Sequence, residues 1–259
     1  MKTFHTNRQY GLPIGVALLA SIVVLLGLYI QDAYAFQVPE LPPGNLLFNP
    51  WFRSISNPTL SSLDGWIDAA GPNKYWSTSQ KESNPSPDIV ESGVCGFEKV
   101  YCGTGARLSP MPGQSGGIGV PGVDAYLYQV VSSDSSHHKL KFFTHWVSHK
   151  IDPAEVTIYG GNSPQGPWTK VWVPFSYVDD KNEGTVDLWT QTEFMEKTIN
   201  KGYPFYKVEI HARLPGSEGV GFKITGIYFS TESLDGSGTP IPPPEYDYLH
   251  YLPSVISDS

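Results

Sequence analysis

The sequence is poor in charge and in basic clusters. Charged residues make up 16% of the 259 residues, against about 25% in a typical soluble domain. Lysine and arginine are scattered singly, and the formal net charge is -8. A protein that binds nucleic acid needs a basic patch for the phosphates, so we expect no nucleic-acid partner.

Stretches that favour helices are also few, whereas turn-forming and aromatic residues are abundant. The chain has 26 glycines, 23 prolines, 15 tyrosines and 7 tryptophans. This balance is typical of a loop-rich β-protein outside the cell. Both ends lack a globular pattern, so we expect one all-β domain of ordinary size.

The N-terminal segment has the order of a secretory signal. Lys2 and Arg8 precede the apolar residues 11–30, and Ala33 and Ala35 form a small-x-small cleavage site. The apolar run is nearly the length of about 20 residues that spans a bilayer, so an uncleaved anchor remains the alternative. In both cases we expect a secreted or cell-surface domain whose only link to a membrane is this segment.

The chain therefore divides into four parts. We expect a signal peptide or signal-anchor helix over residues 1–35 and a spacer over residues 36–44. A β-sandwich should follow over residues 45–231, and a Pro-rich linker with a C-terminal tail over residues 232–259.

Period-2 patterning predicts the strands of the domain. Residues 205–214 alternate apolar residues with Lys207, Glu209, His211 and Arg213, so one face is buried and one faces water. Residues 125–131 and 140–149 follow each other at hairpin spacing, and we expect them to pair. Eight or so short strands of this kind predict a β-sandwich.

Two motifs carry a resemblance to a known family. Residues 45–52 read N-L-L-x-N-x-x-F and lead to Trp66, and residues 125–131 read A-x-L-x-Q-x-V. These motifs resemble the carbohydrate-binding modules of families 4, 9 and 22, which are galactose-binding-like jelly rolls. The resemblance implies a single jelly-roll β-sandwich, an opening strand at residue 45, and a carbohydrate ligand. We expect Trp51 and Trp66 to pack in the core.

The same resemblance raises the question of calcium. In those families an acidic residue soon after the opening phenylalanine and another in the final strand help to bind it. Here Arg53 follows Phe52, and residues 225–228 contain no acid. We therefore expect no metal and no cofactor, and calcium remains the alternative that the resemblance implies. His145 and His149 lie about 13 Å apart on a strand and cannot share a metal alone.

The water-facing sides of the strands are the candidate ligand site. Sugar recognition needs an aromatic ring beside groups that hydrogen-bond hydroxyls. The ordinary alternative is a solvated face with cross-strand ion pairs, and both interpretations stay open for His211 and Arg213. The candidate ligand-binding residues are Trp172, Trp189, Gln191, Glu209, His211 and Arg213.

The only two cysteines, Cys95 and Cys102, predict a small disulfide in an exported chain. A zinc pair would need histidines at ligand spacing, and redox chemistry would need C-x-x-C.

Catalytic motifs are weak. Residues 113–117 match G-x-S-x-G but lack the strand before and the helix after that a nucleophile elbow requires. The acidic residues between 179 and 193 single out no pair for glycoside hydrolysis. We expect a non-catalytic glycan-binding module. Adhesion to another surface protein and glycoside-active enzyme chemistry remain the alternatives.

Overall fold

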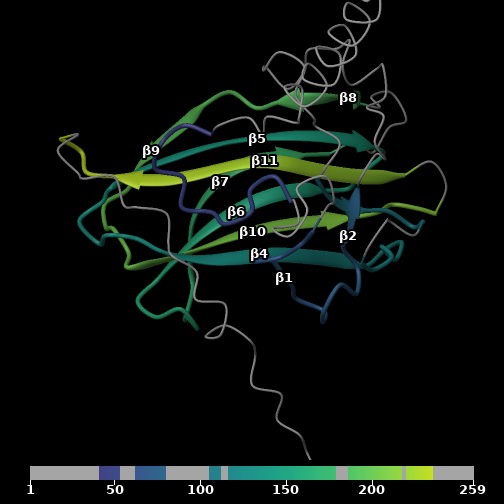
Figure 1. Ribbon diagram of the computed structural model, residues 1–259, viewed down its shortest axis with the longest axis horizontal. Coiled ribbons are helices and arrows are strands. Elements are labelled where there is room, and N and C mark those ends of the chain that lie inside the picture. Colours follow the sequence, from purple (N-terminus) through teal and green to yellow (C-terminus); the bar gives the residue numbers. More distant parts are fainter. Residues whose placement is uncertain are drawn as a thin grey trace, which may run out of the picture. The chain divides into compact units, whose positions relative to one another are not determined.

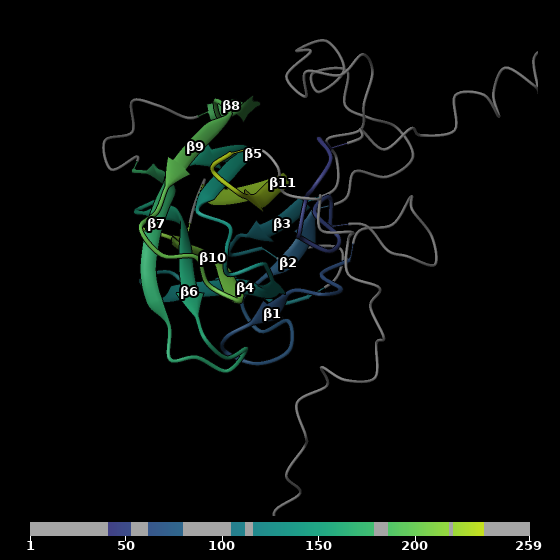
Figure 2. The same ribbon diagram turned by 90° about the vertical axis from the view of Figure 1, so that its left-hand side faces the viewer.

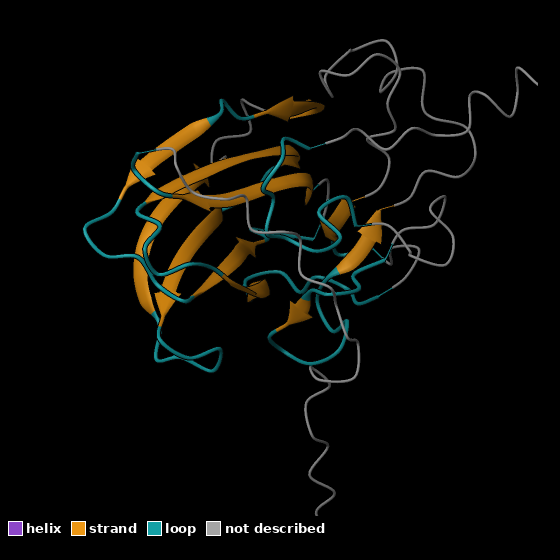
Figure 3. Ribbon diagram, turned by 60° about the vertical axis from the view of Figure 1, so that its left-hand side comes forward, coloured by secondary structure: helices purple, strands orange, loops and turns teal. Residues whose placement is uncertain are grey.

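The computed structural model describes residues 41–52, 62–79, 105–111, 116–178, 186–217 and 220–235. In these ranges every regular element is a strand (Figure 3), and none of them contains a helix long and apolar enough to cross a bilayer. The N-terminal segment with Ala33 and Ala35, the cysteines Cys95 and Cys102, and the C-terminal tail lie outside the described residues.

The strands form two antiparallel sheets that pack as a sandwich (Figure 1). The five-stranded sheet has the order β1 (Ile67–Asp68), β4 (Asp124–Ser132), β10 (Phe205–Arg213), β6 (Ala154–Gly161) and β7 (Thr169–Tyr177). The other sheet has the order β2 (Ser77–Ser79), β3 (Gly105–Leu108), β11 (Gly221–Glu232), β5 (Lys139–His149) and β8 (Val186–Gln191), and β9 (Met195–Thr198) also pairs with β5. Figure 2 shows the two layers from the side. The predicted all-β sandwich is confirmed.

The core lies between the inner faces of the two sheets. On β10, Tyr206, Val208, Ile210 and Ala212 are fully buried, while the residues between them are half-buried on the outer side. The strand β11 contributes buried residues from the opposite sheet. The predicted alternation of one buried and one wet face is confirmed for β10, because residues two apart on a strand face the same way.

The opening segment, residues 45–52, packs on the sandwich as predicted but does not form the predicted strand. Leu46 N donates to Phe229 O at 2.8 Å, and Ile227 N donates to Pro50 O at 3.1 Å. The segment thus lies along β11 beyond the part that β3 pairs with. However, Asn49 and Phe52 have φ values of 46° and 53°, which an extended strand does not allow. The prediction of a strand here is wrong.

Gln129 explains one of the sequence motifs. Its buried side chain accepts a hydrogen bond from Phe48 N at 2.7 Å and donates to Phe48 O at 3.1 Å and to Gly65 O at 2.9 Å. The amide therefore ties the opening segment and the turn before Trp66 to β4. Trp51 and Trp66 are buried, as predicted.

The predicted hairpin between residues 125–131 and 140–149 is wrong. These residues belong to β4 and β5, which lie in different sheets. The connection between them crosses from one sheet to the other, where Ser133 N donates to Pro204 O at 2.9 Å and His138 N donates to Glu232 O at 3.1 Å. Spacing along the chain predicted two strands correctly but not their partners, because pairing is a non-local choice.

Candidate functional site

The outer side of the five-stranded sheet gathers aromatic and polar side chains from three adjacent strands. On β10, Lys207 lies opposite Tyr159, Glu209 lies opposite Tyr128, and His211 lies opposite Tyr126. We call this surface the tyrosine face. It consists of the outward side chains Tyr126, Tyr128, Glu155, Thr157, Tyr159, Lys207, Glu209 and His211.

An ion pair lies at the centre of the tyrosine face. Lys207 Nζ is 2.6 Å from Glu209 Oε2, and the two side chains are only 16% and 13% exposed. The same ammonium group lies 4.4 Å from the ring centroid of Tyr159 and 5.6 Å from that of Tyr128. Both distances suit a cation–π contact. The pair therefore holds the two rings in place and is itself shielded by them.

His211 fixes the third ring. Its imidazole stacks on Tyr126 with the centroids 4.6 Å apart and the planes at 12°. His211 Nε2 is 2.8 Å from Asp124 Oδ1 on the neighbouring strand. The carboxylate orients the imidazole, and the imidazole covers one side of the tyrosine ring.

The phenol groups of this face stay protonated. Burial, followed by the charge of Glu209, raises the pKa of Tyr159 to about 12. Burial also raises the pKa of Tyr126 and of Tyr128, and nearby carboxylates add to both effects. All three tyrosines therefore present hydroxyls that both donate and accept hydrogen bonds at neutral pH.

Trp168 extends the tyrosine face at the end of β6. Gly161 lies opposite Phe205 and has the outward parity of Tyr159. A Cβ atom on Gly161 would lie 2.8 Å from Cζ3 of Trp168, so the half-buried indole ring rests where a side chain would otherwise project. Between the positions on β10 opposite Gly161 and Tyr126 there is roughly 20 Å of strand.

The residues predicted from the sequence are only partly brought together. Glu209, His211 and Arg213 share the outer side of β10, with Arg213 exposed opposite Asp124. Trp172 faces the other way: its ring meets Phe142 edge-on with the centroids 6.3 Å apart and packs against the core.

Trp189 and Gln191 are placed only by their backbone. They belong to β8, which lies in the opposite sheet from Glu209, and their side chains are outside the described part of the structure. Trp189 and Gln191 therefore cannot lie on the same sheet face as Glu209, His211 and Arg213. Their role in binding stays a prediction.

Four aromatic residues of the tyrosine face, Tyr126, Tyr128, Tyr159 and Trp168, are absent from the ligand-binding residues predicted from the sequence. Period-2 alternation places Tyr126, Tyr128 and Tyr159 outward, so the sequence contained a signal for them. Trp168 lies in a loop, and only the tertiary structure shows that its ring covers Gly161.

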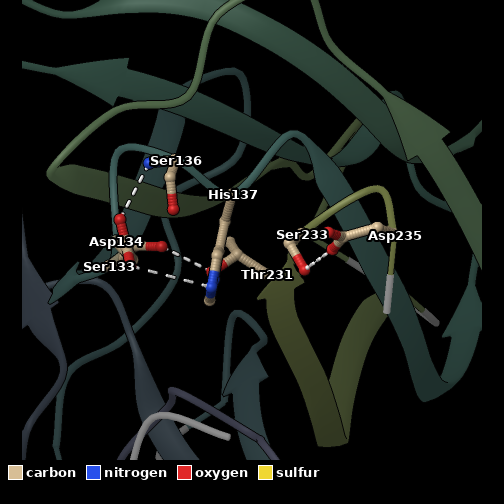
Figure 4. A network of polar contacts seen from close by, with 7 residues as sticks. All are labelled: Ser133, Asp134, Ser136, His137, Thr231, Ser233 and Asp235. Carbon is tan, nitrogen blue, oxygen red and sulfur yellow. Dashed lines mark hydrogen bonds and ion pairs between the residues drawn. The ribbon is translucent and has the colours of Figure 1, made fainter. Parts of the chain in front are cut away.

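A second polar cluster joins the β4–β5 connection to the end of β11 (Figure 4). Thr231 Oγ1 contacts Ser133 Oγ and lies 3.2 Å from His137 Nδ1, and His137 Nε2 is 3.9 Å from Asp134 Oδ2. Thr231, His137 and Asp134 thus supply a hydroxyl, an imidazole and a carboxylate in contact, which is also the arrangement of an activated nucleophile. Here Thr231 and His137 are 8% and 4% exposed, and their contacts join the β4–β5 connection to the end of β11.

Other sequence candidates can be placed only in part. Residues 113–115 of the G-x-S-x-G match lie outside the described residues. Across the described ranges, no three histidine, cysteine or acidic side chains come together as a possible metal site.

No protein-family model matches the sequence, and no curated protein matches it. Among solved structures, the enzymatically active domain of tailspike protein 4 from bacteriophage CBA120 matches 73% of this chain and 22% of its own, with 12% identity and a TM-score of 0.42. A family 61 carbohydrate-binding module in complex with beta-1,4-galactotriose matches 73% of this chain and 99% of its own, with 12% identity and a TM-score of 0.42.

A family 4 carbohydrate-binding module matches 66% of this chain and 96% of its own, with 14% identity and a TM-score of 0.33. Modules of families 16 and 22 also match, so the structural neighbours include both binding modules and enzyme chains. The chain is similar to these structures at low sequence identity.

Proposed function

We propose that the tyrosine face binds a carbohydrate chain and that the protein acts as a non-catalytic glycan-binding module. The observation that supports this is the grouping of Tyr126, Tyr128, Tyr159 and Trp168 on one outer sheet surface. Aromatic rings accept the apolar side of a sugar ring, while neighbouring polar groups hydrogen-bond its hydroxyls.

The polar groups between the rings suit such a ligand. Tyrosine hydroxyls donate and accept, the carboxylate of Glu209 accepts, and His211 presents one ring nitrogen beyond the one that meets Asp124. Sugar hydroxyls need both donors and acceptors. The tyrosine face therefore offers a hydrogen-bonding partner next to each tyrosine ring.

The face is also ordered before a ligand arrives. Lys207 contacts two of the rings, and His211 stacks on the third. Rings that are already held in place lose less rotational freedom on binding, which favours affinity. Recognition through these groups requires no metal.

The experiment is a glycan array followed by affinity electrophoresis with the retained polysaccharide. The variant Tyr128→Ala removes a ring from the tyrosine face, and its matched control is Phe194→Ala. Phe194 is 47% exposed and packs with Phe143 and Tyr228 of the other sheet. We expect Tyr128→Ala to weaken retention and Phe194→Ala to leave it unchanged.

Two results contradict the proposal. The first is a parent protein that retains no glycan on the array. The second is loss of retention in Trp189→Ala with full retention in Tyr128→Ala, which would move the site to the six-stranded sheet.

We also infer that the module is exported. The support is the order of basic, apolar and small residues across residues 2–35. N-terminal sequencing of protein recovered from the medium or the cell surface should begin at Phe36. A sequence beginning at Met1 or Lys2 would show that cleavage does not occur.

A further inference from the structure

The Lys207–Glu209 pair governs the charge of the tyrosine face. Lys207 is the cation at its centre, and its side chain is 16% exposed, with the ammonium group over the rings of Tyr128 and Tyr159. Glu209 Oε2 approaches this ammonium group to 2.6 Å. Since the two groups are in direct contact, their charges cancel for any ligand that lies across the rings.

The remaining charges near this centre are also balanced. The outer side of β4, β10, β6 and β7 carries equal numbers of acidic and basic residues. Each acidic side chain has a polar or charged partner. Glu155 accepts a hydrogen bond from Ser176 Oγ at 3.2 Å, and Asp124 meets His211 at 2.8 Å. The outward charged residues are Asp124, Glu155 and Glu209, and Lys170, Lys207 and Arg213.

A carboxylated glycan would have to compete with Glu209 for Lys207. It would also leave the Glu209 carboxylate without its cation on a half-covered surface, which is unfavourable. The whole chain carries a formal charge of -8, which adds repulsion of a polyanion at low salt. A chain of uncharged sugars meets none of these costs.

We propose that Glu209 is the residue that sets charge selectivity on the tyrosine face, by neutralising Lys207 so that neutral glycans are bound in preference to acidic ones. This inference rests on the proposed function. It predicts that removing the carboxylate charge turns Lys207 into an available cation without removing an aromatic ring.

The test uses Glu209→Gln, which keeps the shape of the side chain and one acceptor oxygen but removes the charge. Its matched control is Glu196→Gln, which makes the same change in net charge on the other sheet, where Glu196 pairs with Lys139 at 2.8 Å. The double variant Glu209→Gln with Lys207→Met removes both charges of the central pair.

Binding is measured by affinity electrophoresis in gels that contain hydroxyethyl cellulose, galactan, carboxymethyl cellulose or polygalacturonate. We expect the parent to be retarded by a neutral polymer more than by either acidic one. Glu209→Gln should bind the acidic polymers about tenfold more tightly than the parent at low ionic strength. This gain should disappear in high salt and should be absent in Glu196→Gln and in the double variant.

The outcomes separate the two proposals. If the parent prefers an acidic polymer, or if Glu196→Gln gains as much as Glu209→Gln, the selectivity role is overturned while glycan binding stands. If none of the polymers and no glycan on the array retains the parent, glycan binding itself is contradicted, and the selectivity role with it. Thermal melts of each variant test whether the fold is intact.

Discussion

The contact between Trp168 and Gly161 gives the sharpest prediction about the tyrosine face. A Cβ atom on Gly161 would lie 2.8 Å from Cζ3 and 2.9 Å from Cε3 of Trp168. This is about 1 Å closer than the optimal separation of two carbon atoms. The variant Gly161→Ala should therefore push the indole ring off the sheet while every aromatic residue remains present.

The expected loss of affinity can be estimated from the area of the ring. A tryptophan side chain buries about 150–250 Å² when it is fully enclosed, so one face covers on the order of 80 Å². At about 25 cal/mol per Å² this corresponds to about 2 kcal/mol, or about 30-fold in affinity, for Trp168→Ala. We expect about three- to tenfold for Gly161→Ala, because a displaced ring keeps part of its contact.

The assay is isothermal titration calorimetry with an oligosaccharide of the glycan that the array identifies. The control is Gly216→Ala, since nothing lies within 4 Å of a Cβ atom at that position, and it should bind like the parent. If Trp168→Ala and Gly161→Ala both bind like the parent, the ligand does not reach this end of the face. If only Trp168→Ala is weakened, the indole binds the ligand without depending on its seat over Gly161.

Three further predictions concern stability and metal. Gln129→Leu leaves Phe48 N and two carbonyl oxygens without their amide partner, so the free energy of unfolding in urea should fall by about 3–5 kcal/mol; a loss below about 1 kcal/mol would contradict the tie between β4 and the opening segment. The pKa values of Tyr159 and Tyr206 are raised by burial to about 12, so their contribution to stability is complete below pH 10 and is lost as the pH rises through about 12. Melting temperatures measured across this interval should fall, and a constant value would show that both phenols titrate as in the unfolded chain. Chelation by EDTA should leave glycan binding unchanged, whereas a loss that calcium restores would reveal a metal requirement that the tyrosine face does not explain.

The sequence by itself determined most of the long strands and much of the core. Alternating apolar residues on β10 require one buried face, because successive side chains on a strand point to opposite sides. The same rule assigned Glu209, His211 and Arg213 to the outer side. The burial of Trp51 and Trp66 followed from the family resemblance and from the turn before Trp66, and both rings lie in the core.

Only the tertiary structure decided which strands share a sheet. β4 and β5 follow each other along the chain yet lie in different sheets, and β8 lies opposite the sheet of Glu209. Strand pairing is non-local, so alternation within one strand carries no information about its neighbours.

For Trp172 and Trp168, too, the tertiary structure and not the sequence pattern decided where the side chain lies. Register shifts between β6 and β7 place Trp172 opposite the buried Ile158, so its ring turns inward, and a bulge of this kind changes which side chains face the core. Trp168 joins the tyrosine face because Gly161 lacks a side chain on the facing strand. The sequence fixes the parity of a regular strand, whereas bulges, crossovers and loop contacts depend on how distant segments pack, and these decided the composition of the tyrosine face.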